Sequence, residues 1–170
     1  MNCRQNWSKA CEEELNRQID REYQASLLYH LLSNYFNRDN VGLNKLVTYF
    51  NKASLEERGH ANQLMNYQNM RGGVVVFSNV IPEDSYVGLI TKLEQPNDII
   101  GSFKIALDME KEINGHLLEL HQLADENNDA QFCDYLEGDF LKEQVEAISE
   151  LSKIVSVLER FNNDQHAIWN

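Results

Sequence analysis

Hydrophobic residues recur along four long segments of the chain, at alternating steps of three and four positions. This spacing gathers them on one face of an α-helix, so the pattern predicts four amphipathic helices. We expect these helices at residues 8–38, 44–71, 98–126 and 129–161. Each has a continuous apolar stripe, which suits packing at a shallow angle in a helical bundle.

Turn signals lie between these segments. The sequence "RDNVG" at 38–42 is a short break, so we expect the first two helices to form an antiparallel hairpin. The glycine pair at 72–73 predicts a helix C-cap. The sequence "ENNDAQ" at 126–131 separates the last two helices, and Asn128 with Gln131 is expected to form a capping box.

A long connection, about residues 73–98, joins the two hairpins and begins with "GGVVVFSNVI", which we expect to be extended. Two helical hairpins joined by one long crossover match the ferritin-like type of four-helix bundle. We therefore expect an all-α chain that forms a single domain over residues 1–170.

Charge and cysteine content restrict the possible partners and compartments. The formal net charge of −12 disfavours nucleic acid and anionic membranes and attracts cations, so we expect neither as a partner. The apolar run "VVVF" is too short to span a bilayer. The cysteine count is odd and there is no CxxC pair, which favours free thiols in a reducing compartment.

The N-terminal sequence "MNCRQNWSKACEEEL" contains no apolar stretch of the kind found in secretory signals. We therefore expect a cytoplasmic location, or an organelle if a transit peptide has been removed.

Polar residues interrupt each apolar stripe near its middle. These residues are Glu22, Glu57 with His60, Glu110, and Gln144. Buried carboxylates without a cation are costly, and none of the stripes supplies a Lys or Arg. One or two metal ions would balance the charge, and carboxylates with one imidazole suit iron, manganese or zinc. Glu57 and His60 form the Glu-x-x-His pair of di-iron bundles.

Each residue also has a simpler interpretation. An isolated Glu-x-x-His pair arises often by chance, and Gln144 alone would be an ordinary buried amide. Tyr29 lies two turns after Glu22 on the same face, where its hydroxyl would hydrogen-bond a ligand carboxylate or simply pack as an aromatic ring. The coincidence of four interrupted stripes favours the metal site.

In these motifs the chain resembles ferritin, in particular the catalytic heavy-chain type and its plant relatives. The resemblance extends from residues 4–7 to residues 158–161, and its motifs include "NRQIDREYQASLLY", "SLEERGHANQLM", "QNMRGG", "ALDMEKEIN" and "EQVEAI". It implies that Glu22 and His60 hold one iron and Glu110 a second, with Glu57 bridging them. It also implies that Tyr29 and Gln144 are hydrogen-bonding partners of these ligands.

The resemblance further implies a ferroxidase that oxidises Fe(II) with O₂ at this di-iron site and stores ferric mineral. The implied assembly is a cage of 24 subunits, either a homo-oligomer or a mixture with other ferritin subunits. Four residues would line its iron-entry channel: His121, Cys133, Asp134 and Glu137. Without the resemblance, acids near a helix start simply complement the helix dipole. Glu56 and Glu143 are candidates for mineral nucleation or iron transfer.

Several features depart from the ferritin pattern. Gly59 and Asn62 occupy positions where heavy chains usually carry acids, which puts the nucleation cluster in doubt. The "VVVF" run at 74–77 is expected at a twofold contact between subunits, since such a patch is rarely left exposed. The chain ends in "NDQHAIWN" where a short fifth helix normally follows, so we expect that helix to be truncated or absent.

Two other functions fit less well. One is a different di-iron carboxylate oxidase or peroxidase, which usually has a second Glu-x-x-His on the last helix, whereas here Glu143 is followed three positions later by Glu146. The other is a helical bundle that acts by interaction, such as a cytokine. That class would be expected to have a signal peptide and paired cysteines.

Overall fold

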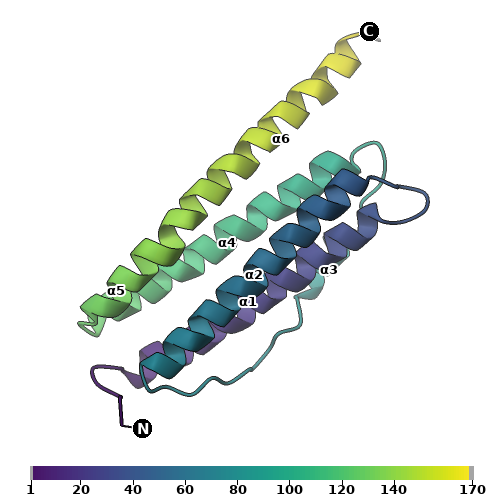
Figure 1. Cartoon of the computed structure of the whole chain (residues 1–170). Helices are drawn as coiled ribbons and strands as arrows, with labels where there is room; N and C mark the ends of the chain where they lie inside the picture. Colours follow the sequence, from purple (N-terminus) through teal and green to yellow (C-terminus); the bar gives the residue numbers. More distant parts are fainter. Residues whose placement is uncertain (1, 169–170) are drawn as a thin grey trace.

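Four long helices run side by side in the computed structural model of the chain (Figure 1). They are α1 (Lys9–Phe36), α2 (Asn44–Met70), α4 (Asp98–Glu126) and α6 (Lys142–Ile168). The structure describes the backbone of residues 2–168 and the side chains of residues 2–161, and this backbone contains no strand. The all-α, ferritin-like bundle predicted from the sequence is therefore confirmed.

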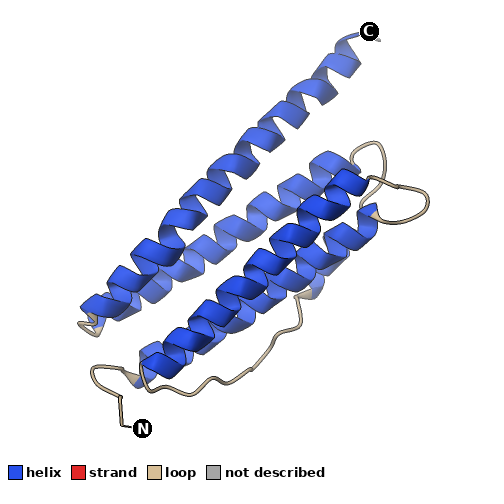
Figure 2. Ribbon diagram, in the orientation of Figure 1, coloured by secondary structure: helices blue, strands red, loops and turns tan. Residues whose placement is uncertain are grey.

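The connection between α2 and α4 runs along the bundle, because α2 ends and α4 begins at opposite ends of it (Figure 2). This connection contains a short helix, α3 (Asp84–Thr91), which the sequence analysis did not predict. The helix is too short for a clear periodic pattern, and Ile90 is its one buried residue. Packing against α1 and α4 therefore stabilises it rather than its own sequence.

Polar side chains spaced four residues apart on α1 hold the extended part of this crossover. Glu12 accepts from the amide of Val74 at 2.8 Å, and the Asn16 side chain donates to the carbonyl of the same residue at 2.9 Å. One turn further, Oδ2 of Asp20 accepts from the amides of Ser78 and Asn79, both at 2.9 Å. Side chains on α1 thus provide hydrogen bonds to the crossover backbone that a neighbouring strand would provide in a sheet.

The fourth helical segment was predicted as one continuous helix, but it is interrupted. It consists of α5 (Ala130–Leu136), a π-helical turn η1 (Glu137–Leu141) and α6. A π-turn adds a residue to one helical turn and occurs often at functional sites. Periodicity does not reveal this insertion, because the stripes before and after it are each regular.

The predicted capping box before this segment is also wrong. Asp129 is the N-cap, and its side chain accepts from the amide of Phe132. Asn128 has a positive φ of 54° and Gln131 instead accepts a hydrogen bond from the hydroxyl of Tyr67. The predicted cap at the end of α2 is confirmed, since Gly72 has a φ of 77° and the Gly73 amide donates to the carbonyl of Gln68.

Within the bundle, α1 packs against α2 and α4, and α4 packs against α6, whereas the backbones of α2 and α6 stay apart over their described lengths. At one end of the core Phe50 packs against Phe36 and Phe103. At the other end Trp7 meets the ring of Phe132. Between these two aromatic clusters lie the polar residues predicted to bind metal.

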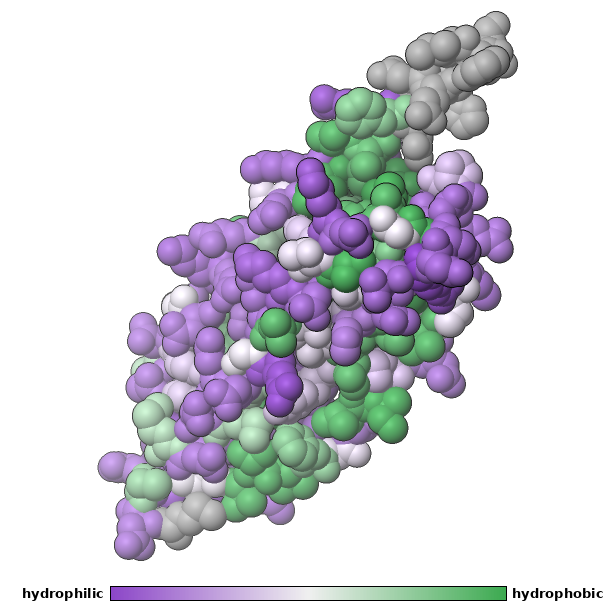
Figure 3. All heavy atoms as spheres, turned by 45° about the vertical axis from the view of Figure 1, so that its right-hand side comes forward, coloured by the Kyte–Doolittle hydropathy of each residue, from purple (hydrophilic) through white to green (hydrophobic). Residues whose placement is uncertain are grey.

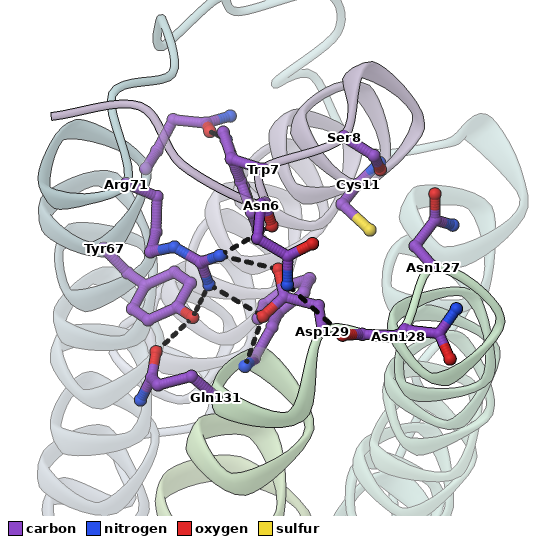
Figure 4. Close-up of polar contacts among 12 residues, drawn as sticks. Asn6, Trp7, Ser8, Cys11, Tyr67, Arg71, Asn127, Asn128, Asp129 and Gln131 are labelled. Atoms are coloured by element: carbon purple, nitrogen blue, oxygen red, sulfur yellow. Dashed lines mark hydrogen bonds and ion pairs between the residues drawn. The ribbon is translucent and has the colours of Figure 1, made fainter. Parts of the chain in front are cut away.

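An ion pair between the partly buried Arg71 and the buried Asp129 closes the end of the bundle beside Trp7. Figure 4 shows the guanidinium of Arg71 between the side chains of Tyr67 and Asp129. Arg71 reaches the Asp129 carboxylate at 2.7 and 3.1 Å and also donates to the carbonyl of Asn6. The guanidinium lies 4.7 Å from the Trp7 ring centre. This pair therefore joins α2, the start of α5 and the N-terminal segment.

Charged and polar side chains cover most of the surface, with apolar groups gathered in separate patches on the face seen in Figure 3. One apolar groove, of about 440 Å³, lies between α1, α2 and the crossover. Leu27, Leu55 and Phe77 on its walls are 43%, 60% and 53% exposed. None of the described helices combines the length and apolarity needed to cross a membrane.

The last helix continues to Ile168, beyond the end at residue 161 that we expected. The predicted truncation or loss of a fifth helix concerns chain beyond this point and lies outside the described residues.

Candidate metal centre

Three polar side chains from α1 and α2 meet in the middle of the bundle. Glu22, Glu57 and His60 each offer one ligand atom, and these atoms lie within 4.8 Å of one another. Nδ1 of His60 is 3.1 Å from Oε2 of Glu57 and 3.9 Å from Oε2 of Glu22. Glu22 and Glu57 are buried, and 12% of the His60 side chain is exposed. The structure thus brings these three predicted ligands together.

The third predicted carboxylate, Glu110 on α4, is buried and held from two sides. Tyr29 on α1 donates its hydroxyl hydrogen to Oε1 of Glu110. The side-chain amide of Gln144 on α6 donates to Oε2 of Glu110 at 2.9 Å and to its main-chain carbonyl at 3.0 Å. Tyr29 and Gln144 therefore hold this carboxylate in one orientation.

One carboxylate oxygen in the cluster has no hydrogen-bond donor. Oε1 of Glu22 accepts from the side-chain amide of Gln18 at 2.7 Å, whereas Oε2 has no partner among the described side chains. A buried oxygen in this state is costly unless a proton or a cation meets it. Gln18 is not among the predicted site residues, although its position four residues before Glu22 places both on one helical face.

Burial and mutual repulsion disfavour the charged forms of these acids. Desolvation, followed by the negative charge of Glu57, raises the pKa of Glu22 well above its ordinary value. Desolvation and the charge of Glu110 likewise raise the pKa of Glu57. Burial and the neighbouring Glu110 carboxylate raise the pKa of the Tyr29 phenol, so that it stays a hydrogen-bond donor. A bound cation would reverse these penalties on the carboxylates.

A cavity of about 300 Å³ connects this cluster to the surface between α2 and α6. Glu57, His60, Glu110 and Gln144 line its inner part, and the candidate transfer residues Glu56 and Glu143 also line it. Glu56 is exposed and pairs with Lys52 at 3.2 Å. Glu143 reaches Nε2 of His60 at 3.2 Å, a contact that the sequence analysis did not foresee.

The donor set fits a hard or borderline metal ion. Carboxylate oxygens with one imidazole nitrogen are the ligands that iron, manganese and zinc accept. The unpartnered oxygen of Glu22 is an available ligand atom, and the cavity beside Glu57 and His60 has room for further ligands of the metal. The two sequence departures lie outside this cluster, with Asn62 exposed and Gly59 open enough that an added Cβ would meet nothing within 4 Å.

The second group of predicted residues lies around α5 and the end of α4. Nε2 of His121 is 2.7 Å from Oε1 of Glu137, and Sγ of Cys133 is 3.9 Å from the carbonyl of His121. Asp134 is exposed one turn before Glu137. Partial burial and the nearby charges of Asp125 and Glu137 raise the pKa of the Cys133 thiol. The structure thus groups His121, Cys133 and Glu137 at one end of the bundle.

Comparison with known proteins identifies the family. Residues 12–161 match the ferritin family, described as a ferritin-like domain. The chain is 43% identical to a chloroplastic ferritin of Malus baccata var. xiaojinensis, over 98% of this chain and 65% of that protein. It is 41% identical to ferritin-3 of Glycine max and to ferritin-4 of Arabidopsis thaliana, both chloroplastic, over 98% of this chain and 63% and 62% of theirs.

The chain spans just under two thirds of the length of these relatives. The family match nevertheless covers residues 12–161, which include α2, α4, most of α1 and α6, and the metal-ligand candidates on these helices. The chain therefore belongs to the ferritin family.

Proposed function

We propose that this protein stores iron and is a ferroxidase, with Fe(II) as the electron donor and O₂ as the acceptor. The observation that carries the proposal is the group formed by the buried carboxylates of Glu22 and Glu57 and the imidazole of His60, with an unpartnered oxygen on Glu22. The buried Glu110 carboxylate lines the same cavity as Glu57 and His60. In this interpretation Fe(II) is the substrate and ferric iron is the stored cargo, in keeping with membership of the ferritin family.

Each residue has a defined part in this proposal. Glu22 and His60 hold one Fe(II), Glu110 holds the second, and Glu57 lies between them as the bridge. Anionic oxygen ligands stabilise Fe(III) relative to Fe(II), so the carboxylates favour oxidation. Tyr29 and Gln144 hold the Glu110 carboxylate in place by the hydrogen bonds that they donate.

Entry and exit routes complete the proposal. Fe(II) would enter through a channel lined by His121, Cys133, Asp134 and Glu137, where acidic groups raise the local cation concentration. The cavity between α2 and α6, with Glu56 and Glu143 on its wall, would release Fe(III) toward the stored mineral.

We propose that the chain assembles into a cage, expected to contain 24 subunits. The apolar groove beside residues 74–77 supports the assembly, since exposed patches of this kind mark protein contacts. Light scattering at physiological salt tests the proposal. A large, uniform particle is expected, and a stable monomer or dimer would contradict the cage without affecting the metal centre.

The relatives named above are chloroplastic, whereas the sequence led us to expect the cytoplasm or an organelle. We propose an organelle for this chain if its precursor carries a transit peptide, and the cytoplasm otherwise. Cell fractionation followed by mass spectrometry of the N-terminus distinguishes the two.

Anaerobic titration of the metal-free protein with Fe(II), followed by rapid mixing with O₂, tests the ferroxidase directly. We expect about two tightly bound Fe(II) ions per subunit and fast oxidation without an added organic substrate. Absence of tight binding in the folded protein would refute the site. Oxidation that requires an organic substrate or peroxide would instead indicate another di-iron oxidase or peroxidase.

A further inference from the structure

The two ring nitrogens of His60 face different carboxylates. Nδ1 points to the metal cluster, 3.1 Å from Glu57 and 3.9 Å from Glu22. Nε2 points away from it and lies 3.2 Å from Oε1 of Glu143. His60 belongs to α2 and Glu143 to α6, so this contact crosses the cavity between two helices whose backbones stay apart.

From this geometry we propose that Glu143 is a positioning residue, which fixes the tautomer and ring orientation of His60 for metal binding. The inference rests on the proposed metal centre and gives Glu143 a role at that centre in addition to its place on the wall of the proposed exit route. In a neutral imidazole one nitrogen donates a proton and the other accepts. When Nε2–H donates to Glu143, the lone pair of Nδ1 faces Glu22 and Glu57, where a metal ligand is needed.

The fold brings Glu143 to this position through the π-turn. Residues 137–141 form that turn, and Glu143 and Gln144 lie in the first turn of α6, which begins at Lys142. Because a π-turn adds a residue, it changes which face the following positions present to the bundle. Gln144 thereby reaches Glu110 and Glu143 reaches His60, so one local insertion serves both.

Phe140, also within the π-turn, packs near the imidazole. Its ring lies 5.8 Å from the His60 ring, centre to centre, in an edge-on arrangement with an interplanar angle of 66°. Phe140 is buried and offers no acceptor, and among the described side chains Glu143 is the one that an ion pair joins to Nε2. The Glu143 side chain is 53% exposed, so its own replacement should not disturb the core.

Glu143→Gln and Glu143→Ala together distinguish the effect of the hydrogen bond that orients His60 from the effect of the negative charge of Glu143. A glutamine at this position keeps a carbonyl oxygen that accepts from Nε2–H but removes the negative charge, whereas alanine removes both. Glu146→Ala is the matched control, because Glu146 lines the same cavity on the same helix and no ion pair joins it to His60 among the described side chains.

Calorimetric titration of the metal-free, full-length protein with Zn(II) supplies the first measurement. We expect Glu143→Ala to weaken binding about 10-fold, the lower end of the range for such supporting residues. Glu143→Gln and Glu146→Ala are expected within about threefold of the wild type. Equal losses for Glu143→Gln and Glu143→Ala would mean that charge alone matters, and that result would overturn the proposal, as would no loss in either.

The tautomer itself is measured without metal, by ¹⁵N magic-angle-spinning NMR of histidine-labelled protein, with His60→Ala identifying the signal. We expect the Nε2–H form in the wild type and in Glu143→Gln, and a shift toward Nδ1–H in Glu143→Ala. A His60 signal that is independent of residue 143 overturns the inference. A wild type with the expected tautomer that binds no Zn(II) would instead refute the metal centre on which the inference rests.

Discussion

Tyr29 on α1 donates its hydroxyl hydrogen to the carboxylate of Glu110 on α4, although the two residues are 81 positions apart in the sequence. The amide of Gln144 occupies the other oxygen of the same carboxylate. A buried carboxylate held from both sides cannot rotate freely, so it presents a fixed ligand to a metal bound beside it. Hydrogen bonds of this kind act on metal affinity by orienting the ligand.

We expect Tyr29→Phe to weaken binding of one Fe(II) per subunit about 10-fold, because the freed carboxylate loses its orientation. The loss of a hydrogen bond to a buried carboxylate should also lower the free energy of unfolding by about 2 kcal/mol. Anaerobic Fe(II) titration and urea unfolding measure the two effects. Unchanged affinity would show that Gln144 alone orients Glu110.

The raised pKa of Glu22 predicts a dependence of stability on pH in the metal-free protein. The folded-state pKa lies above the unfolded value of 4.5, so the folded state binds the proton more tightly. The stabilisation is complete below the unfolded pKa and is lost as pH rises toward the folded pKa, by at most about 1.4 kcal/mol per pH unit.

Glu22→Gln should remove this loss, because an amide does not ionise. At pH 7 the metal-free variant is expected to be more stable than the wild type, and the difference should shrink as pH falls toward 4.5. Urea unfolding at several pH values measures it. A constant difference across this range would mean that packing, and not ionisation, separates the two proteins.

Replacing Glu57 and His60 together by alanine tests whether the cluster exists for metal or for folding. The variant should lose rapid Fe(II) oxidation, since the proposed bridge and the imidazole ligand disappear together. Its metal-free stability should change little, because relief of carboxylate repulsion offsets the lost packing. The stabilisation that Zn(II) gives the wild type should fall sharply, since that effect depends on binding to the folded state.

Thermal unfolding of both proteins, with and without Zn(II), accompanies the oxidation measurement. If the double variant is unfolded in every condition, Glu57 and His60 support the core by ordinary hydrogen bonds. If it still oxidises Fe(II) quickly, the site has been assigned to the wrong residues.

The long helices and the ligand candidates could be predicted from the sequence, because both depend on the spacing of nearby residues. Glu57 and His60 lie on one helical face whatever the tertiary structure, so their pairing could be predicted. Contacts between helices could not. The approach of Glu143 to His60 depends on the π-turn, which leaves the periodic pattern on each side intact.

The structure of the crossover also depends on contacts that the spacing of residues does not reveal. Its extended part depends on Glu12, Asn16 and Asp20 on α1, polar positions that in sequence look like an ordinary solvated face. Helix α3 depends on packing rather than on its own propensity, and a helix of this length gives no periodic signal. Elements stabilised by distant partners are therefore the ones that spacing alone did not reveal.

Removing one partner from the ion pair of Arg71 and Asp129 should destabilise the fold strongly. Asp129→Asn leaves the guanidinium beside Trp7 and Tyr67 without its counter-charge, so we expect the free energy of unfolding to fall by about 3 kcal/mol. Denaturant unfolding measures the change. The metal centre lies elsewhere in the bundle, so Zn(II) affinity should stay within about twofold, and a parallel loss of affinity would show that the two regions are coupled.

The acidic residues near α5 provide the last test, which concerns delivery rather than chemistry. Replacing Asp134 by Asn and Glu137 by Gln removes two negative charges from the proposed entry channel but leaves the metal cluster unchanged. Oxidation should slow at low Fe(II), because a focusing field raises the local cation concentration. At saturating Fe(II) the rate should match the wild type.

Salt separates this field effect from structural damage. Screening weakens the wild-type advantage as ionic strength rises, since the Debye length falls from about 10 Å at 0.1 M to about 3 Å at 1 M. The defect of the double variant should therefore shrink with added salt in rapid-mixing assays. Glu137 also contacts His121 at 2.7 Å, so a defect that persists at every salt concentration would point to the loss of that contact and to altered assembly.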